Sequence, residues 1–235
     1  MLRNHALLWL FVLAVLTAFP VSEARSAGDT VWEFDFSAFN EADWISARDA
    51  AVPEIGRFVQ KDGYIQNYVK PEHRGLHTLE AGHALRLLKD DAIDNVRIET
   101  ELMLVGKAAP SIYFNTQLDG DVHQETYNLV VFDFSTPENK HYYGLNLWKW
   151  QKTWPKDVRP SAKHWVKLAS WAFPVPLNKK HKLTVDKNKR YITVYLNGQL
   201  KGTVYDANPL PPGRVGLCSC EGVNNFYSLK VTKRN

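Results

Sequence analysis

The sequence feature that most constrains the fold is an alternating stretch near the C-terminus. Residues 182–186 (KLTVD) and 191–196 (YITVYL) alternate apolar and polar side chains, and a polar run separates them. Asn197-Gly198 follows, a pair that readily adopts positive φ and is typical of a tight hairpin turn. Residues 199–205 then return as the partner strand. Because strict alternation indicates half-buried strands, an antiparallel meander is predicted here.

Similar short apolar stretches recur along the chain, separated by Pro and Gly. This spacing favours a sandwich or barrel over alternating strand–helix units, so the expected fold class is all-β. One short helix is expected over residues 40–51, where good helix formers gather. In residues 80–88, Leu85 and Leu87 alternate with Arg86 and favour a strand. The other predicted strands are residues 31–36, 63–68, 96–104, 111–117, 127–134, 142–149, 165–171, 214–218 and 226–231.

The N-terminal residues 1–27 are predicted to be a signal peptide. Arg3 precedes an uncharged apolar run at residues 6–19, and small residues follow the run. The run is shorter than the about 20 apolar residues of a membrane-spanning helix. Cleavage after Ala24 or after Ala27 satisfies the small-residue rule, and we favour Ala27. The protein is therefore expected to be secreted or periplasmic, with no membrane span once the leader is removed.

Residues 28–235 are predicted to form a single domain, long enough to bury one sizeable core. Removal of the leader takes away two basic residues and one acidic residue, so the formal net charge falls from +4 to +3. Basic runs such as residues 178–182 (NKKHK) are more often solvated turns than nucleic-acid patches. No nucleic-acid partner is expected.

The chain has two cysteines, Cys218 and Cys220, spaced as C-x-C. On a strand both side chains would point to the same face, with Cα atoms near the limit of about 7 Å for a disulfide. A strained disulfide and a pair of small buried thiols both stay open. No His lies near them in the sequence, so a metal site has little support.

The order of these segments resembles a known superfamily. Residues 181–206 (HKLTVDKNKRYITVYLNGQLKGTVYD), 213–217 (GRVGL) and 226–231 (FYSLKV) resemble the C-terminal half of concanavalin A-like lectin/glucanase domains. The similarity is greatest to the laminin-G-like and 3-keto-disaccharide hydrolase (domain of unknown function 1080) type. Earlier segments in the same order are WEFDF (32–36), DGYIQN (62–67) and DNVRIETELML (94–104).

This resemblance implies two antiparallel sheets packed as a jelly roll, with the first and last strands adjacent. Many such domains bind or cleave glycans on the concave outer face of one sheet. Their catalytic motifs are not found here. The Glu-x-Asp-x-x-Glu strand of laminarinase-type glucanases is absent, and residues 110–115 (PSIYFN) keep only the Ser and Ile of the Asn-Ser-Gly-Ile stretch. Nucleotide-binding, zincin and hydrolase-elbow motifs are also absent, so no cofactor is expected.

Five of the eight Trp residues lie between residues 142 and 171. On a strand through residues 142–150, alternation places Leu145 and Leu147 on one face with Tyr143, and that face is then the core face. The opposite face would line a groove, where aromatic rings stack on sugars and amides bind hydroxyls. Trp and Tyr are also common in sandwich cores, which is the competing interpretation. The predicted outward set is Tyr142, Asn146, Trp148 and Trp150.

The same alternation turns Ile112 and Phe114 toward the core and Tyr113 outward. Side chains at the same parity, and at the start of the next strand, would extend the ligand-binding face. The residues added to the predicted ligand-binding set are Asn115, Gln117 and Tyr127.

Catalysis would depend on Glu125 and Asp133, the carboxylate pair near the proposed groove. Two carboxylates about 5 Å apart, or an acid and a base somewhat further apart, can hydrolyse a glycosidic bond. Glu125 can equally be a solvated loop carboxylate. His123 and His141 flank this region and could act as acid/base groups or metal ligands, although lone His residues near turns are more often polar surface.

A structural calcium ion is the metal to be considered. Asp119 and Asp121 surround Gly120 and could supply oxygen ligands. Asp-Gly is first of all turn chemistry, and the remaining ligands of a recognised calcium loop are missing.

Three functions are compatible with these patterns. The first is a secreted module that binds an oligo- or polysaccharide on the concave sheet face. The second is a hydrolase acting on glycosidic bonds or on 3-keto-glycosides. The third is a structural or protein-interaction domain of the laminin-G-like kind, which predicts that the aromatic cluster is buried.

Overall fold

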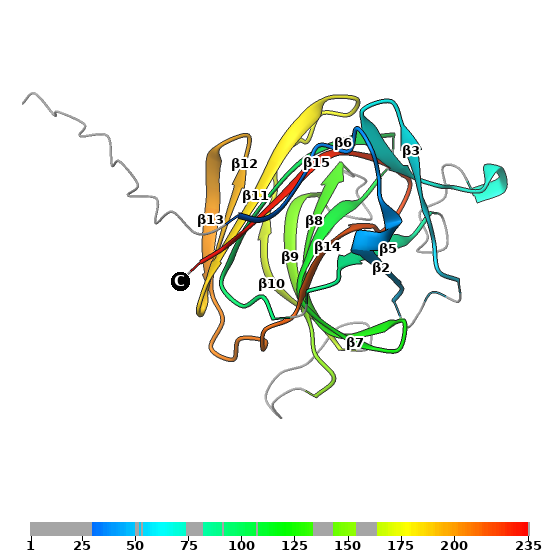
Figure 1. Ribbon diagram of the computed structural model, residues 1–235. Helices are drawn as coiled ribbons and strands as arrows, with labels where there is room; N and C mark the ends of the chain where they lie inside the picture. Colours follow the sequence, from blue (N-terminus) through cyan, green and yellow to red (C-terminus); the bar gives the residue numbers. More distant parts are fainter. Residues whose placement is uncertain are drawn as a thin grey trace, which may run out of the picture.

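The computed structural model describes residues 30–49, 52, 54–73, 82–90, 92–106, 108–133, 143–153 and 164–234, except for the side chains of residues 30, 31 and 133. The predicted signal peptide lies outside these ranges. Within them, the chain forms two antiparallel β-sheets that pack face to face (Figure 1). The all-β sandwich predicted from the sequence is confirmed. No helix in this part of the chain has the length and hydrophobicity needed to cross a membrane.

The two sheets, as far as the structure describes them, have eight and seven strands. Sheet A contains, in spatial order, β13 (Gln199–Tyr205), β12 (Tyr191–Leu196), β11 (Lys180–Asn188), β6 (Val96–Val105), β15 (Val223–Lys233), β4 (Tyr64–Asn67) and β3 (Phe58–Lys61), with β1 (Thr30–Phe34) added beside β15. Sheet B contains β10 (Trp165–Trp171), β9 (Tyr143–Trp150), β8 (Val122–Asp133), β7 (Pro110–Asp119), β14 (Arg214–Ser219), β5 (Ala84–Leu88) and β2 (Trp44–Ala47). Two short 3-10 turns are η1 (Glu41–Asp43) and η2 (Pro71–His73).

The first and last described strands are neighbours, as the family resemblance implies. Glu33 of β1 pairs with Lys230 of β15, and the two strands run side by side in Figure 1. The predicted meander is also confirmed. Asn197 and Gly198 have φ values of 52° and 77° and join β12 to β13.

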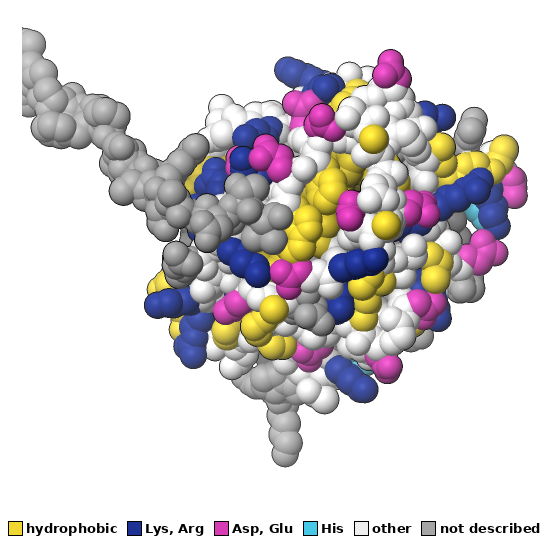
Figure 2. Space-filling view, viewed as in Figure 1, with side chains coloured by type: hydrophobic (Ala, Val, Ile, Leu, Met, Phe, Trp, Pro, Cys, Tyr) yellow, Lys and Arg dark blue, Asp and Glu magenta, His cyan; other side chains and the backbone are white. Residues whose placement is uncertain are grey.

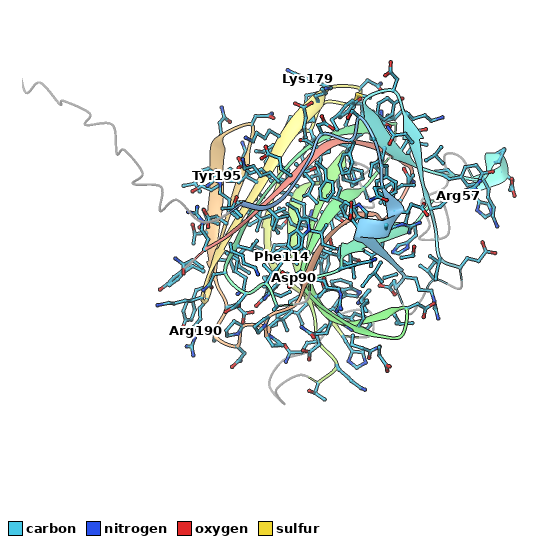
Figure 3. All side chains as sticks on the ribbon, viewed as in Figure 1. Arg57, Asp90, Phe114, Lys179, Arg190 and Tyr195 are labelled. Carbon is cyan, nitrogen blue, oxygen red and sulfur yellow. The ribbon has the colours of Figure 1, made fainter. Side chains whose placement is uncertain are left out.

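The main core lies between the sheets. β6 alternates buried and half-buried side chains along its whole length, with Ile98 among the buried ones. From sheet B, Ile112, Phe114, Leu145 and Leu147 are fully buried in the same cluster, so their predicted inward orientation is confirmed. Phe114 lies inside the sandwich in Figure 3.

The helix predicted over residues 40–51 is wrong. Asn40 caps only the single turn η1, and the chain then enters β2, where Trp44 pairs with Leu88 of β5. The Trp44 indole is buried against Phe34 and neighbouring rings. Helix propensities differ by a few tenths of a kcal/mol per residue, whereas burial of a large apolar side chain contributes about 1.5–3 kcal/mol. Tertiary burial therefore decides the local structure.

A buried network closes the loop of residues 206–213. The Asp206 carboxylate accepts hydrogen bonds from Lys149 Nζ at 2.8 Å and from the Tyr127 hydroxyl at 2.6 Å. The Tyr127 hydroxyl in turn accepts from the Leu210 N–H at 2.9 Å. Burial alone would raise the pKa of Asp206, but the hydrogen bonds and the charge of Lys149 hold it below its usual value. Burial raises the pKa of Tyr127.

The outer side of sheet A is a lattice of ion pairs. Lys182 Nζ lies 2.8 Å from Glu99 Oε1 on the neighbouring strand, and Lys230 Nζ lies 3.1 Å from Glu33 Oε2. Basic and acidic side chains are correspondingly interspersed on the face seen in Figure 2.

Candidate functional site

The outer face of sheet B carries a second apolar cluster. Leu85 and Leu87 of β5, Cys218 of β14 and Tyr113 of β7 all point away from the main core, yet each is at most 1 % exposed. The predicted outward orientation of Tyr113 is confirmed. An outer sheet face this deeply buried needs a cover.

The curvature of sheet B provides part of that cover. β2 lies four positions from β8 in the sheet order, which corresponds to about 19 Å in a flat sheet. Nevertheless Arg48, directly after β2, forms a bridge to Val122 at the start of β8. The pairing of β7 and β8 contains two register shifts, and such bulges bend a hairpin. The β7–β8 hairpin therefore bends over the outer face until its tip meets β2.

Two side-chain contacts fasten this closure. Arg48 Nε lies 3.0 Å from Asp121 Oδ2, and His123 Nε2 lies 3.0 Å from Asp49 Oδ2. Asp121, one of the two predicted calcium ligands, thus forms an ion pair with an arginine. Asp119 is exposed at the end of β7. Across the described residues, no group of three or more His, Cys, Asp or Glu side chains is arranged to hold a metal ion.

The enclosed part of this face also contains the two cysteines. Their Sγ atoms are 3.7 Å apart, and both residues are buried free thiols. His83, distant in sequence, places its Nε2 3.7 Å from Cys218 Sγ. Burial raises the pKa of the Cys218 thiol and lowers the pKa of His83 to about 4. The thiol is therefore protonated and unreactive at neutral pH.

We expect neither thiol of the native protein to react with Ellman's reagent, because both are buried and Cys218 is held in its thiol form. In guanidinium chloride both should react at once. The measurement is thiol absorbance before and after unfolding, in protein purified without reductant. Rapid reaction of the native protein would contradict the buried thiols. Absence of thiols after unfolding would show that Cys218 and Cys220 had formed a disulfide.

Beyond the enclosed part, aromatic side chains lie on β9 and β10. The ring centroids of Trp150 and Trp165 are 5.3 Å apart, and Lys167 Nζ lies 4.6 Å from the ring centroid of Trp148. All four side chains are half-buried. Trp148 and Trp165 pack on the outer cluster, and Trp150 contacts the His123 ring, so the predicted outward face of β9 is confirmed. Tyr142 and His141 lie outside the described residues.

Two buried amides lie between these rings and the thiols. Asn146 Oδ1 accepts a hydrogen bond from Ser170 Oγ at 2.8 Å, and Asn128 Nδ2 lies 3.9 Å from Cys220 Sγ. Among the described residues, Asn146 Nδ2 and Asn128 Oδ1 are buried without a hydrogen-bond partner. Trp165, Lys167 and Asn128 were not in the predicted site. Asn128 lies in a stretch that is apolar on both faces, so alternation could not orient it.

Three residues of the predicted ligand-binding set hold the loop of residues 206–213 instead. Tyr127 belongs to the main core. Asn115 Nδ2 donates to the Pro211 carbonyl at 2.9 Å, and Gln117 Nε2 donates to the Pro212 carbonyl. Asn115 has a φ of 51° at the first bulge of β7, so alternation no longer predicts where the following side chains point. The structure removes these three residues from the outer face.

The predicted carboxylate pair is not brought together. Glu125 and Asp133 lie eight residues apart on the single strand β8. At about 3.3 Å per residue their backbones are about 26 Å apart, whereas glycosidases need about 5–10 Å between carboxyl groups. These two residues cannot act on the same glycosidic bond.

The chain matches no protein-family model and no curated protein sequence. Solved structures are similar to it over most of its length. A Bacillus subtilis protein of unknown function with a galectin-like fold has a TM-score of 0.65 at 14% identity, covering 88% of this chain and 97% of that one. The fold is a concanavalin A-like β-sandwich.

Two further structures share this sandwich. The carbohydrate-binding module CBM66 from Bacillus subtilis has a TM-score of 0.58 at 14% identity and covers 81% of this chain and 96% of its own. The Bacillus licheniformis β-glucanase has a TM-score of 0.57 at 13% identity, with coverage of 88% and 99%. At such identities the likeness concerns the fold. The narrower resemblance to the laminin-G-like and 3-keto-disaccharide hydrolase type stays a prediction.

Proposed function

We propose that this protein is an extracytoplasmic carbohydrate-binding sandwich that holds a glycan on the concave outer face of sheet B, over β9 and β10. The observation that carries the proposal is the group of half-buried side chains Trp148, Trp150, Trp165 and Lys167 on two neighbouring strands. Indole faces stack on the C–H faces of sugar rings, and polar groups at their rims bind hydroxyls. Location outside the cytoplasm rests on the predicted leader.

The similar structures support this choice of ligand class. One is named as a carbohydrate-binding module and another as a β-glucanase, so the same sandwich serves glycans in both proteins. Fold alone does not specify function, and the aromatic group is therefore the stronger support.

The alternatives have less support. Hydrolysis by Glu125 and Asp133 is not compatible with their separation along β8, and hydrolysis would need a different carboxylate pair. A purely structural or protein-interaction domain predicts a buried aromatic cluster. The indoles of Trp148, Trp150 and Trp165 each keep part of their surface accessible, which favours binding.

Trp148→Ala and Trp150→Ala are each expected to weaken glycan binding at least tenfold, because each removes one stacking surface worth about 1–2 kcal/mol. The first measurement is a polysaccharide and oligosaccharide array, followed by calorimetric titration of the best ligand. Tyr191→Ala is the matched control. Tyr191 is 55 % exposed on β12 of sheet A, so its removal also deletes an exposed ring but should leave binding unchanged. Equal binding by all three variants and the parent protein would contradict the proposed site.

A further inference from the structure

A pocket of about 450 Å³ lies on another side of the sandwich, where the segments before β3, after β4 and before β5 meet. Its volume is within the range of small-molecule sites, about 300–1,000 Å³. Arg57, which lines it, is at the edge of the molecule in Figure 3, near the protruding turn η2. The pocket contains none of the Trp residues proposed above.

One wall of the pocket combines an aromatic ring and a guanidinium group. Arg57 Cζ lies 4.4 Å from the ring centroid of Tyr68, and the Tyr68 N–H donates to the Arg57 carbonyl at 2.9 Å. Tyr68 is nevertheless 41 % exposed. A guanidinium stacked on a ring keeps its N–H edge available for a planar, bidentate acceptor such as a carboxylate.

The charges in the pocket leave one cation in excess. Lys70 Nζ lies 3.1 Å from Glu54 Oε2, so these two groups neutralise each other. Within the described ranges, no carboxylate lies within ion-pair distance of Arg57. The pocket therefore favours a ligand with a single negative charge placed at Arg57.

The floor of the pocket presents two imidazoles. His73 Nδ1 and His83 Nδ1 are buried and have no hydrogen-bond partner in the described part of the chain. His83 is 4 % exposed, and its other ring nitrogen faces Cys218. A buried polar atom left unpaired costs about 1–3 kcal/mol. Ligand hydroxyl groups would satisfy both nitrogens.

The backbone is shaped to form this floor. A Cβ atom added at Gly56 would lie 1.7 Å from the His83 carbonyl oxygen, so only glycine lets the chain pass this close. The Gly56 carbonyl is fixed by a 2.9 Å hydrogen bond from Arg86 Nη1. The position of His83 under the pocket is therefore built into the fold.

We propose that this pocket binds a sugar unit that carries a carboxylate, a uronic acid, with the carboxylate on Arg57, the ring against Tyr68 and hydroxyls on His73 and His83. The ligand class follows from one spare cation, one accessible aromatic ring and two unpaired imidazole nitrogens in a single cavity. This site does not share residues with the aromatic face of sheet B, so either proposal can fail alone.

The test is titration of the folded full chain with D-glucuronate and, in parallel, with D-glucose. Glucuronate should bind and glucose should not, and raised salt should weaken glucuronate binding because the contact with Arg57 is ionic. Arg57→Gln should weaken binding at least tenfold, and Arg57→Lys should restore only part of it because lysine lacks the bidentate fork. Arg190→Gln, on the distant β12 hairpin, and Trp150→Ala should bind glucuronate like the parent.

A second readout locates the ligand. The ring-nitrogen NMR signals of His73 and His83 should shift on addition of glucuronate, whereas that of His181, outside the pocket, should not. Unchanged binding by Arg57→Gln, equal binding of glucose, or unmoved His73 and His83 signals would overturn the proposal. Acetate or inorganic phosphate binding as tightly as glucuronate would replace the sugar site with a general anion site and also overturn it.

Discussion

Asp206→Asn is expected to lower the free energy of unfolding by about 3–5 kcal/mol, because it leaves the buried ammonium of Lys149 without a countercharge. Lys149 is 1 % exposed, so water cannot take the place of the carboxylate. The same substitution disturbs the hydrogen bond of the Tyr127 hydroxyl and with it the anchor of the 206–213 loop. Denaturant unfolding of the parent and the variant measures the difference.

Two controls isolate the cause. Glu33→Gln removes a carboxylate from an exposed ion pair with Lys230 and should cost about 0–1 kcal/mol. Adding Lys149→Met to Asp206→Asn removes the unpaired charge and should recover part of the lost stability. If Asp206→Asn costs no more than Glu33→Gln, the buried pair does not stabilise the fold as described.

The Asp206 effect should depend on pH. The pKa of Asp206 is lowered in the folded protein, so the ionised carboxylate favours the folded state. Its contribution is fully present above the unfolded pKa of about 3.9 and is lost as the pH falls through the lower folded pKa. The stability difference between the parent and Asp206→Asn should therefore shrink below about pH 4.

Gly144→Ala should also lower the free energy of unfolding by about 3–5 kcal/mol, since it combines backbone strain with a steric clash. Gly144 has a φ of +78°, and an added Cβ would lie 2.1 Å from the Trp171 carbonyl oxygen. Relief of that clash would separate β9 from the end of β10, the two strands of the aromatic face. Thermal and denaturant unfolding would measure the loss.

Gly120→Ala is the matched control for Gly144→Ala. Gly120 has a φ of +60°, but an added Cβ would meet nothing within 4 Å. This variant carries only the backbone penalty of about 1–2 kcal/mol. Equal losses for both glycines would show that the close approach to Trp171 contributes nothing.

The sequence predicted best where strands are regular. Alternation in residues 142–150 correctly turned Leu145 and Leu147 inward and Asn146 and Trp148 outward, because β9 contains no bulge before Trp150. The Asn197-Gly198 turn was predicted from local chemistry alone, and the structure confirms it.

Prediction failed where a single residue breaks the period. The bulge at Asn115 moves that residue and Gln117 away from the outer face, and no local residue pattern marks it. The proximity of His83 to Cys218 spans 135 positions, and only the pairing of β5 with β14 creates it. The pocket at Arg57 was also missed, since it forms between segments that have no shared motif.

The pairing of β1 with β15 has a consequence for how the protein is made. Lys230 reaches Glu33 across 197 positions, and β15 also separates β6 from β4 in sheet A. During synthesis β15 emerges after every other described strand, so β1, β4 and β6 wait with unpaired edges, and such edges recruit other chains. Folding can be completed only after translation has passed residue 233. A product truncated before β15 should aggregate rather than form a smaller sandwich.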